Sequence, residues 1–179
     1  MALTQEQRDW LRLTMLPGVG STQFIRLLAR FLTPGQVLKA SVSALREVVG
    51  PVLAERISQY SDAVDVSTQE RLLETSGAVL VTLEDPGYPV KLAEIYDPPL
   101  VLFVRGTPPE PEENCVAVVG TRAATPYGVR MAERFGRDLA AQGITVVSGM
   151  AAGIDAAAHE GAIQAGGRTM AVLGCGVDV

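Results

Sequence analysis

Three short apolar segments near the C-terminal end of the sequence constrain the fold most strongly. They span residues 115–119, 144–147 and 169–173, and each leads into a glycine-containing loop. Two helical patterns separate them, at residues 126–142 and 154–165, so the order is strand–helix–strand–helix–strand. Short, continuously apolar strands in this order are typical of a parallel sheet that is buried on both faces. The pattern predicts an α/β fold in which this region forms the first half of a Rossmann-like, doubly wound domain.

The N-terminal part of the sequence shows a different pattern. Apolar residues recur at helical spacing through residues 5–75, and two β-rich runs follow at 78–82 and 100–105. We therefore expect an all-helical domain at residues 1–75 and a truncated Rossmann-like domain at residues 76–179. Because the sequence stops just after the third strand, we expect a second half to be missing. The alternative is a complete small domain whose open edge is covered by the helical segment or by a partner chain.

Composition and charge exclude several classes of protein. No apolar run approaches the roughly 20 residues that a membrane helix needs, and the start of the chain lacks the pattern of a secretory signal. Two cysteines without a disulfide framework fit the cytoplasm, and a single histidine leaves too few ligands for a structural zinc site. The net charge of −5 comes entirely from residues 76–113, because residues 1–75 and 114–179 are each balanced. Nucleic-acid binding by the flanking regions is therefore compatible with the charge.

The loop after the first predicted parallel strand has the chemistry of an anion site. It contains Gly120, Thr121 and Arg122, and Thr125 followed by Pro126 predicts a helix start directly after it. Backbone amides at such a place favour anions, and we expect Gly120 to let a phosphate approach the backbone while Arg122 binds it. The spacing fits neither a dinucleotide fingerprint nor a P-loop. The alternative is a turn that binds nothing.

The loop after the second strand contains Ser148, Gly149 and Gly153 and leads into Asp155. In a doubly wound sheet it lies beside the first loop, at the carboxyl edge where ligands bind. Asp155 and His159 are four residues apart on one helix face. They are either an acid–base pair or, as we favour, a first-turn aspartate hydrogen-bonded to a histidine.

A further motif lies between the first two predicted helices. Residues 16–20 read Leu-Pro-Gly-Val-Gly and look like a helix-hairpin-helix, whose hairpin amides contact nucleic-acid phosphates without reading sequence. Residues 49–52 form a weaker second copy. The alternative is a tight turn used for packing or protein contact.

Taken in order, these segments resemble the bacterial DNA-processing protein A family (DprA, also called Smf). The matching segments are Leu-Pro-Gly-Val-Gly at 16–20, Tyr-Pro at 88–89, Asp-Pro-Pro-Leu-Val-Leu-Phe-Val-Arg-Gly at 97–106, Val-Val-Gly-Thr-Arg at 118–122, Tyr-Gly at 127–128, Val-Ser-Gly-Met-Ala-Ala-Gly-Ile-Asp at 147–155, Ala-His at 158–159 and Ala-Val-Leu-Gly-Cys-Gly-Val-Asp at 171–178.

The resemblance implies a function as well as a fold. It implies a sterile-alpha-motif-like helical domain followed by an extended Rossmann fold. The family binds single-stranded DNA, protects incoming strands during natural transformation, helps load the RecA recombinase, commonly dimerises and is not known for turnover or a cofactor. The strand-binding residues that the resemblance implies here are Gly120, Thr121, Arg122, Ser148, Gly149, Gly153 and Asp155. The family usually has a basic residue at the position of Ala152, so this loop is less positive here.

Three hypotheses follow. The first is a cytoplasmic recombination mediator that binds single-stranded DNA without being an enzyme. The second is a hydrolase of nucleoside monophosphates, which needs a catalytic carboxylate at Asp155 or in a missing half. The third is a protein-interaction module in which residues 1–75 bind a regulator. Tyr127 stacks on a base in the first hypothesis and otherwise packs in the core.

Overall fold

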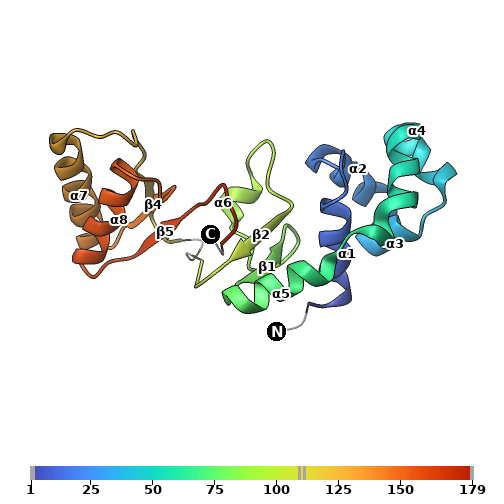
Figure 1. The fold of residues 1–179 in the computed structure, drawn as a ribbon, viewed down its shortest axis with the longest axis horizontal. Coiled ribbons are helices and arrows are strands. Elements are labelled where there is room, and N and C mark those ends of the chain that lie inside the picture. The colour runs from blue at the N-terminus through green and yellow to red at the C-terminus, as the bar shows by residue number, and fades with distance from the viewer. Residues whose placement is uncertain (1–2, 109, 111, 178–179) are drawn as a thin grey trace. The chain divides into compact units, whose positions relative to one another are not determined.

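The structure is a computed structural model that describes residues 3–108, 110 and 112–177. The chain divides into two compact units (Figure 1): unit 1 ends at Thr107, and unit 2 runs from Pro108 to Val177. The order of elements confirms an α/β protein with an N-terminal helical region and a small parallel sheet. No helix in the described ranges combines the length and apolar character needed to cross a membrane.

Unit 1 is built mainly from helices that pack around a buried aromatic pair. The indole of Trp10 stacks on the ring of Phe24 with 4.6 Å between centroids, and leucines, valines and Ile57 complete the core. The helical backbone is interrupted at Gly50, whose φ is 77°. The helices are α1 (Gln5–Thr14), α2 (Ser21–Phe31), α3 (Pro34–Lys39), α4 (Val42–Tyr60), the short 3₁₀ turn η1 (Ser61–Ala63), α5 (Val66–Ser76) and α6 (Val90–Ala93).

Two antiparallel strands belong to the same unit. They are β1 (Val79–Thr82) and β2 (Val101–Val104), paired from Val79 opposite Val104 to Thr82 opposite Val101. Leu100, just before β2, is buried in the helical core, and the Gln7 side-chain amide donates to the Leu80 carbonyl oxygen at 3.2 Å. The antiparallel pair β1–β2 packs on the helices. The compact unit therefore extends to Thr107, beyond residue 75, where we expected the helical domain to end.

Unit 2 contains the predicted alternation of strands and helices. Strands β3 (Cys115–Ala117), β4 (Thr145–Ser148) and β5 (Thr169–Ala171) are parallel and lie in chain order, connected by α7 (Pro126–Ala141) and α8 (Ile154–Gln164). The boundaries follow the sequence signals. The Thr125 hydroxyl oxygen accepts from the Gly128 amide and caps α7, and Gly143, at a φ of 73°, provides the turn into β4.

The expectation that this sheet is buried on both faces is wrong for the described residues. All three residues of β3 are exposed, and so is Val172 after β5. The buried cluster of unit 2 joins residues of α7 and α8 to Val146 of β4 and Val118, which defines one covered face. Two successive right-handed crossovers in the same direction place both helices on the same side of a sheet, so the opposite face is left without a helix.

The two helices of unit 2 approach each other at glycine. A Cβ at Gly136 of α7 would overlap the carbonyl oxygen of Ala158, and a Cβ at Gly161 of α8 would overlap that of Glu133. The helices therefore touch backbone to backbone at two points, which fixes α8 on α7. Since α8 begins at the strand ends, this contact also sets the position of the loops described next.

Candidate nucleic-acid interface

The loops that follow β3, β4 and β5 meet at the carboxyl edge of the sheet, as the parallel topology requires. The hydrogen-bond ladder continues past the strand ends, because the Val118 amide donates to the Val147 carbonyl oxygen and the Val172 amide donates to the Ser148 carbonyl oxygen, both at 2.9 Å. These bonds place the starts of the three loop segments, residues 118–125, 148–153 and 172–177, side by side. No aspartate or glutamate occurs in the three loop segments.

Asp155 ties the first two loops together. It lies in the first turn of α8 with only 7% of its surface exposed. One carboxylate oxygen accepts from the Gly120 amide and the other accepts from the Gly149 amide, each at 3.2 Å. Asp155 is therefore a positioning residue that crosslinks the β3 and β4 loops through charge-assisted hydrogen bonds.

The glycines serve loop packing. A Cβ at Gly120 would lie 2.6 Å from Ile154, and a Cβ at Gly153, where φ is 90°, would overlap the carbonyl oxygen of Thr121. The Ile154 amide also donates to that same oxygen at 3.3 Å. The expectation that Gly120 leaves space for a phosphate at the backbone is wrong, because Ile154 fills the space and Asp155 engages the amide.

The remaining predicted residues divide into buried and exposed. The Ser148 side chain is buried and donates to the Val118 carbonyl oxygen at 2.6 Å, so it braces the two loops from within. Thr121 and Arg122 are exposed. The Thr121 hydroxyl oxygen accepts from the Ala123 amide at 3.2 Å, which leaves its proton available to a ligand. Among the residues that the structure describes, Arg122 has no carboxylate partner.

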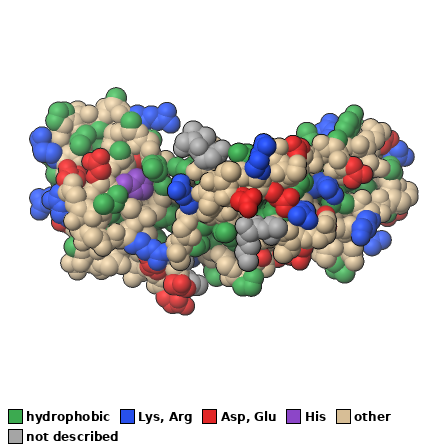
Figure 2. Space-filling view, turned by 60° about the horizontal axis from the view of Figure 1, so that its bottom comes forward, with side chains coloured by type: hydrophobic (Ala, Val, Ile, Leu, Met, Phe, Trp, Pro, Cys, Tyr) green, Lys and Arg blue, Asp and Glu red, His purple; other side chains and the backbone are tan. Residues whose placement is uncertain are grey.

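Exposed apolar side chains accompany these polar groups. Tyr127, in the first turn of α7, has 67% of its surface exposed, so the core alternative for this residue is wrong. Sequence reasoning missed Met150 at the tip of the β4 loop, which is 64% exposed and has a φ of 59°. A non-glycine residue in the left-handed region is uncommon and costs about 1 kcal/mol or more. No sequence signal marks Met150, because methionine does not favour this conformation. Figure 2 shows that basic side chains also lie at the surface of unit 2.

His159 does not form the expected hydrogen bond to Asp155. Its Nδ1 lies 2.6 Å from the Thr169 hydroxyl oxygen, whose own proton is donated to the Val146 carbonyl oxygen at 2.8 Å. Nδ1 must therefore carry the imidazole proton, and Nε2 is buried without a hydrogen-bond partner. Burial lowers the pKa of His159, and the nearby Asp155 carboxylate opposes that shift. The pair is structural rather than an acid–base couple.

The described residues of the site offer no metal-binding cluster of histidine, cysteine and carboxylate side chains. Both cysteines are free and exposed. The site consists of a rigid, internally bonded loop edge that presents Thr121, Arg122 and Tyr127 outward. Such a surface suits a flexible polyanion that also carries apolar rings.

Comparison with known proteins adds independent findings. A family model described as DNA recombination-mediator protein A matches residues 79–179. Protein Smf of Synechocystis sp. is 36% identical over 181 residues, which cover 97% of this chain and 45% of that protein. DNA processing protein DprA of Streptococcus pneumoniae is 45% identical over 95 residues, which cover 53% of this chain and 33% of that protein. The X-ray structure of DNA processing protein A from Streptococcus pneumoniae matches all of this chain and 60% of its own, with a TM-score of 0.75 and 27% identity. This chain therefore spans less than half the length of the two curated relatives.

Proposed function

The chain belongs to the DNA recombination-mediator protein A family, and we propose that it binds single-stranded DNA at the carboxyl edge of the unit 2 sheet as part of a recombination mediator. The observation that carries this proposal is the exposed Arg122 on a loop that Asp155 holds rigid. The three loop segments contain no aspartate or glutamate, and the carboxylate that bonds to them, that of Asp155, is buried and held by the Gly120 and Gly149 amides.

Contact with the strand depends on side chains. Because Asp155 engages the Gly120 and Gly149 amides, phosphate recognition falls to the Arg122 guanidinium and the Thr121 hydroxyl. Tyr127 offers an exposed ring on which an unpaired base can stack. Bases in a duplex are already stacked, so this arrangement favours a single strand and reads no sequence.

The finer features implied by the resemblance are also proposals. They are a sterile-alpha-motif-like helical domain, a Rossmann-like organisation of unit 2, dimerisation, loading of RecA, a role in natural transformation and a cytoplasmic location. We propose binding without turnover. Asp155 supports this, since both of its oxygens hold loop amides and neither is free to act on a nucleoside monophosphate. Release of free base from such substrates would contradict it.

The test is the binding of labelled oligo-dT across a range of salt concentrations, followed by fluorescence anisotropy. Arg122→Ala should weaken binding and lower the slope of log K against log salt by about 0.7, the contribution of one phosphate contact on a single strand. Arg137→Ala is the matched control, because the Arg137 guanidinium already pairs with Glu133 at 2.7 Å. A response independent of salt, or an Arg122 variant that binds as the wild type does, would refute the proposal.

A further inference from the structure

The N-terminal region contains a long segment without acidic residues. Residues 10–46 contain five basic side chains and neither aspartate nor glutamate, within a chain whose net charge is −5. Helix α2 lies wholly inside this segment. Unit 1 therefore carries a local excess of positive charge that the net charge conceals.

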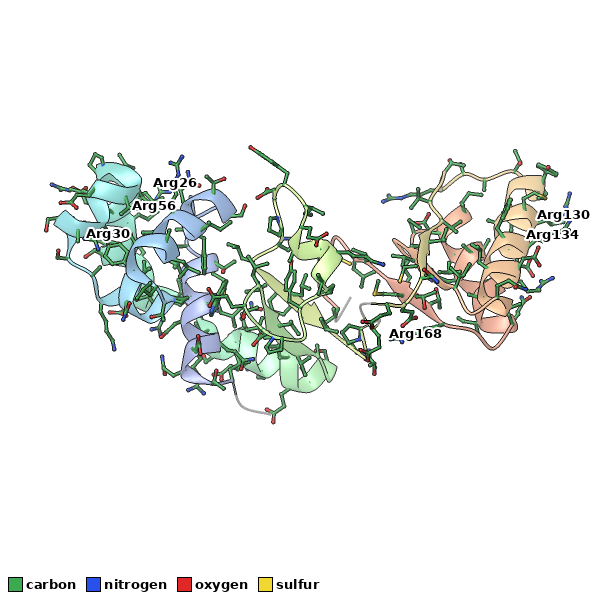
Figure 3. The ribbon with its side chains drawn as sticks, turned by 180° about the vertical axis from the view of Figure 1, so that it is seen from behind. Arg26, Arg30, Arg56, Arg130, Arg134 and Arg168 are labelled. Carbon is green, nitrogen blue, oxygen red and sulfur yellow. The ribbon has the colours of Figure 1, made fainter. Side chains whose placement is uncertain are left out.

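Three arginines near α2 have no carboxylate partner among the described residues. Arg26 and Arg30 are exposed and lie one turn apart on α2, and Arg56 comes from α4. Figure 3 places the three at the same end of the helical bundle. By contrast, Arg46 of α4 is neutralised by Glu55 at 2.5 Å. The charges of Arg26, Arg30 and Arg56 remain available to an anionic partner.

The local structure fixes the position of Arg56. Its Nη1 donates to the Pro17 carbonyl oxygen at 2.6 Å. Gly18, at a φ of 93°, leaves room for the guanidinium, because a Cβ there would lie 2.7 Å from Nη1. A guanidinium has five N–H donors, so most remain free for a ligand. Arg56 also lines an open surface hollow of about 530 Å³ together with Tyr60, which is 55% exposed.

Two features of the turn between α1 and α2 oppose the binding of an anion at its backbone amides. The Val19 amide donates to the Leu16 carbonyl oxygen at 3.1 Å. The first residue of α2, Ser21, donates its hydroxyl to the carboxylate of Asp97, which places a negative charge at that helix end. Cationic side chains along α2 and α4, rather than hairpin amides, supply the attraction for a polyanion.

We infer that Arg26, Arg30, Arg56 and Tyr60, which we call the α2–α4 surface, form a second site for the phosphodiester backbone of single-stranded DNA. The arginines contact phosphates, and Tyr60 stacks on an unpaired base beside Arg56. This inference deepens the proposed function and rests on it for the identity of the ligand. It adds a site in unit 1 to the one in unit 2.

The double variant Arg26→Ala/Arg30→Ala tests the surface, because both side chains are exposed and their one side-chain interaction within the described residues is that of the Arg30 guanidinium over the Phe31 ring at 5.6 Å. In the full protein, the salt slope for oligo-dT should fall by about 1.4, the contribution of two phosphate contacts on a single strand, and binding should weaken. Arg46→Ala is the matched control in the same unit and should leave the slope unchanged. A double variant that keeps the wild-type slope and affinity would overturn the inference.

Two further arms separate the possible outcomes. If Arg122→Ala weakens binding and the double variant Arg26→Ala/Arg30→Ala does not, the second site is refuted while the proposed function stands. If only the double variant weakens binding, the α2–α4 surface is supported and the site in unit 2 is refuted. Tyr60→Leu should weaken oligo-dT binding by about fivefold, the effect of losing a stacking contact of about 1 kcal/mol, and should not change duplex binding. Equal losses on both DNA forms would show that Tyr60 does not stack on an unpaired base.

Discussion

Replacing Asp155 with alanine should loosen the candidate site without removing any group that faces the proposed DNA position. A hydrogen bond to a charged group contributes about 1.5–3 kcal/mol, and Asp155 makes two, to Gly120 and Gly149. The two bonds share one carboxylate, and both glycines are exposed, so water can replace part of what is lost. We therefore expect unit 2 to lose about 2–4 kcal/mol of stability. Asp155→Asn, which keeps one acceptor and turns its NH₂ group toward the other amide, should lose an intermediate amount.

Amide hydrogen exchange in the β3 and β4 loops and in α8 is the suitable stability assay. The single tryptophan, Trp10, lies in unit 1, so its fluorescence does not report directly on unit 2. DNA affinity should fall while the salt slope stays unchanged, because Arg122 is still present but less well held. Removing a negative charge alone would strengthen binding to a polyanion, and Glu160→Ala on the same helix measures that effect. Wild-type exchange rates with wild-type affinity in Asp155→Ala would refute the reasoning.

Two other predictions concern the stability of unit 2. Gly136→Ala should destabilise it by about 1–3 kcal/mol, because the added methyl group overlaps the Ala158 carbonyl oxygen and forces α7 and α8 apart. Gly174→Ala is the control, because a methyl group there meets nothing within 4 Å. Equal urea unfolding midpoints for these two variants would contradict the prediction. The folded state lowers the pKa of His159 below the ordinary histidine pKa of 6.5. As pH falls below 6.5, the unfolded chain therefore binds a proton before the folded chain does, and unit 2 should become less stable. His159→Gln should flatten this dependence in urea titrations at several pH values, and an unchanged pH profile would count against it.

Much of the fold could be predicted because its signals are local. Thr125 followed by Pro126 marks the start of α7, Gly143 marks the turn after it, and the apolar runs mark the parallel strands; all three are found in the structure. The family resemblance carried by the motif string is confirmed by the match over residues 79–179. Each of these signals depends only on residues close together in the chain.

The burial of the sheet could not be predicted in the same way. The apolar composition of β3 indicates that the strand could be buried on both faces. The handedness of the connections decides which face a helix actually covers. Both crossovers run in the same direction, so α7 and α8 share one face. The exposed Val116 and Val172 follow from topology, which the composition of one strand does not contain.

The roles of the site residues also depend on contacts between distant segments. A glycine in a loop indicates that a Cβ does not fit, but the sequence does not say what occupies the space. At Gly120 it is Ile154, and at Gly153 it is the backbone of the first loop. Asp155 was predicted at the correct edge, yet its role as a crosslink required knowing that the amides of Gly120 and Gly149 converge on it.

This crosslinking changes how the protein can hold DNA. A loop whose amides are free can surround a phosphate, and its binding is then strong at a single point. Here the amides hold the loops to each other, so attraction falls to a few exposed guanidinium groups whose contribution decreases with salt. In the proposed binding mode each unit contributes weak contacts of its own, Arg122 in unit 2 and Arg26 and Arg30 in unit 1, and a strand that makes more than one of them gains avidity. Each contact breaks readily by itself, which fits the proposed binding of a single strand without sequence readout.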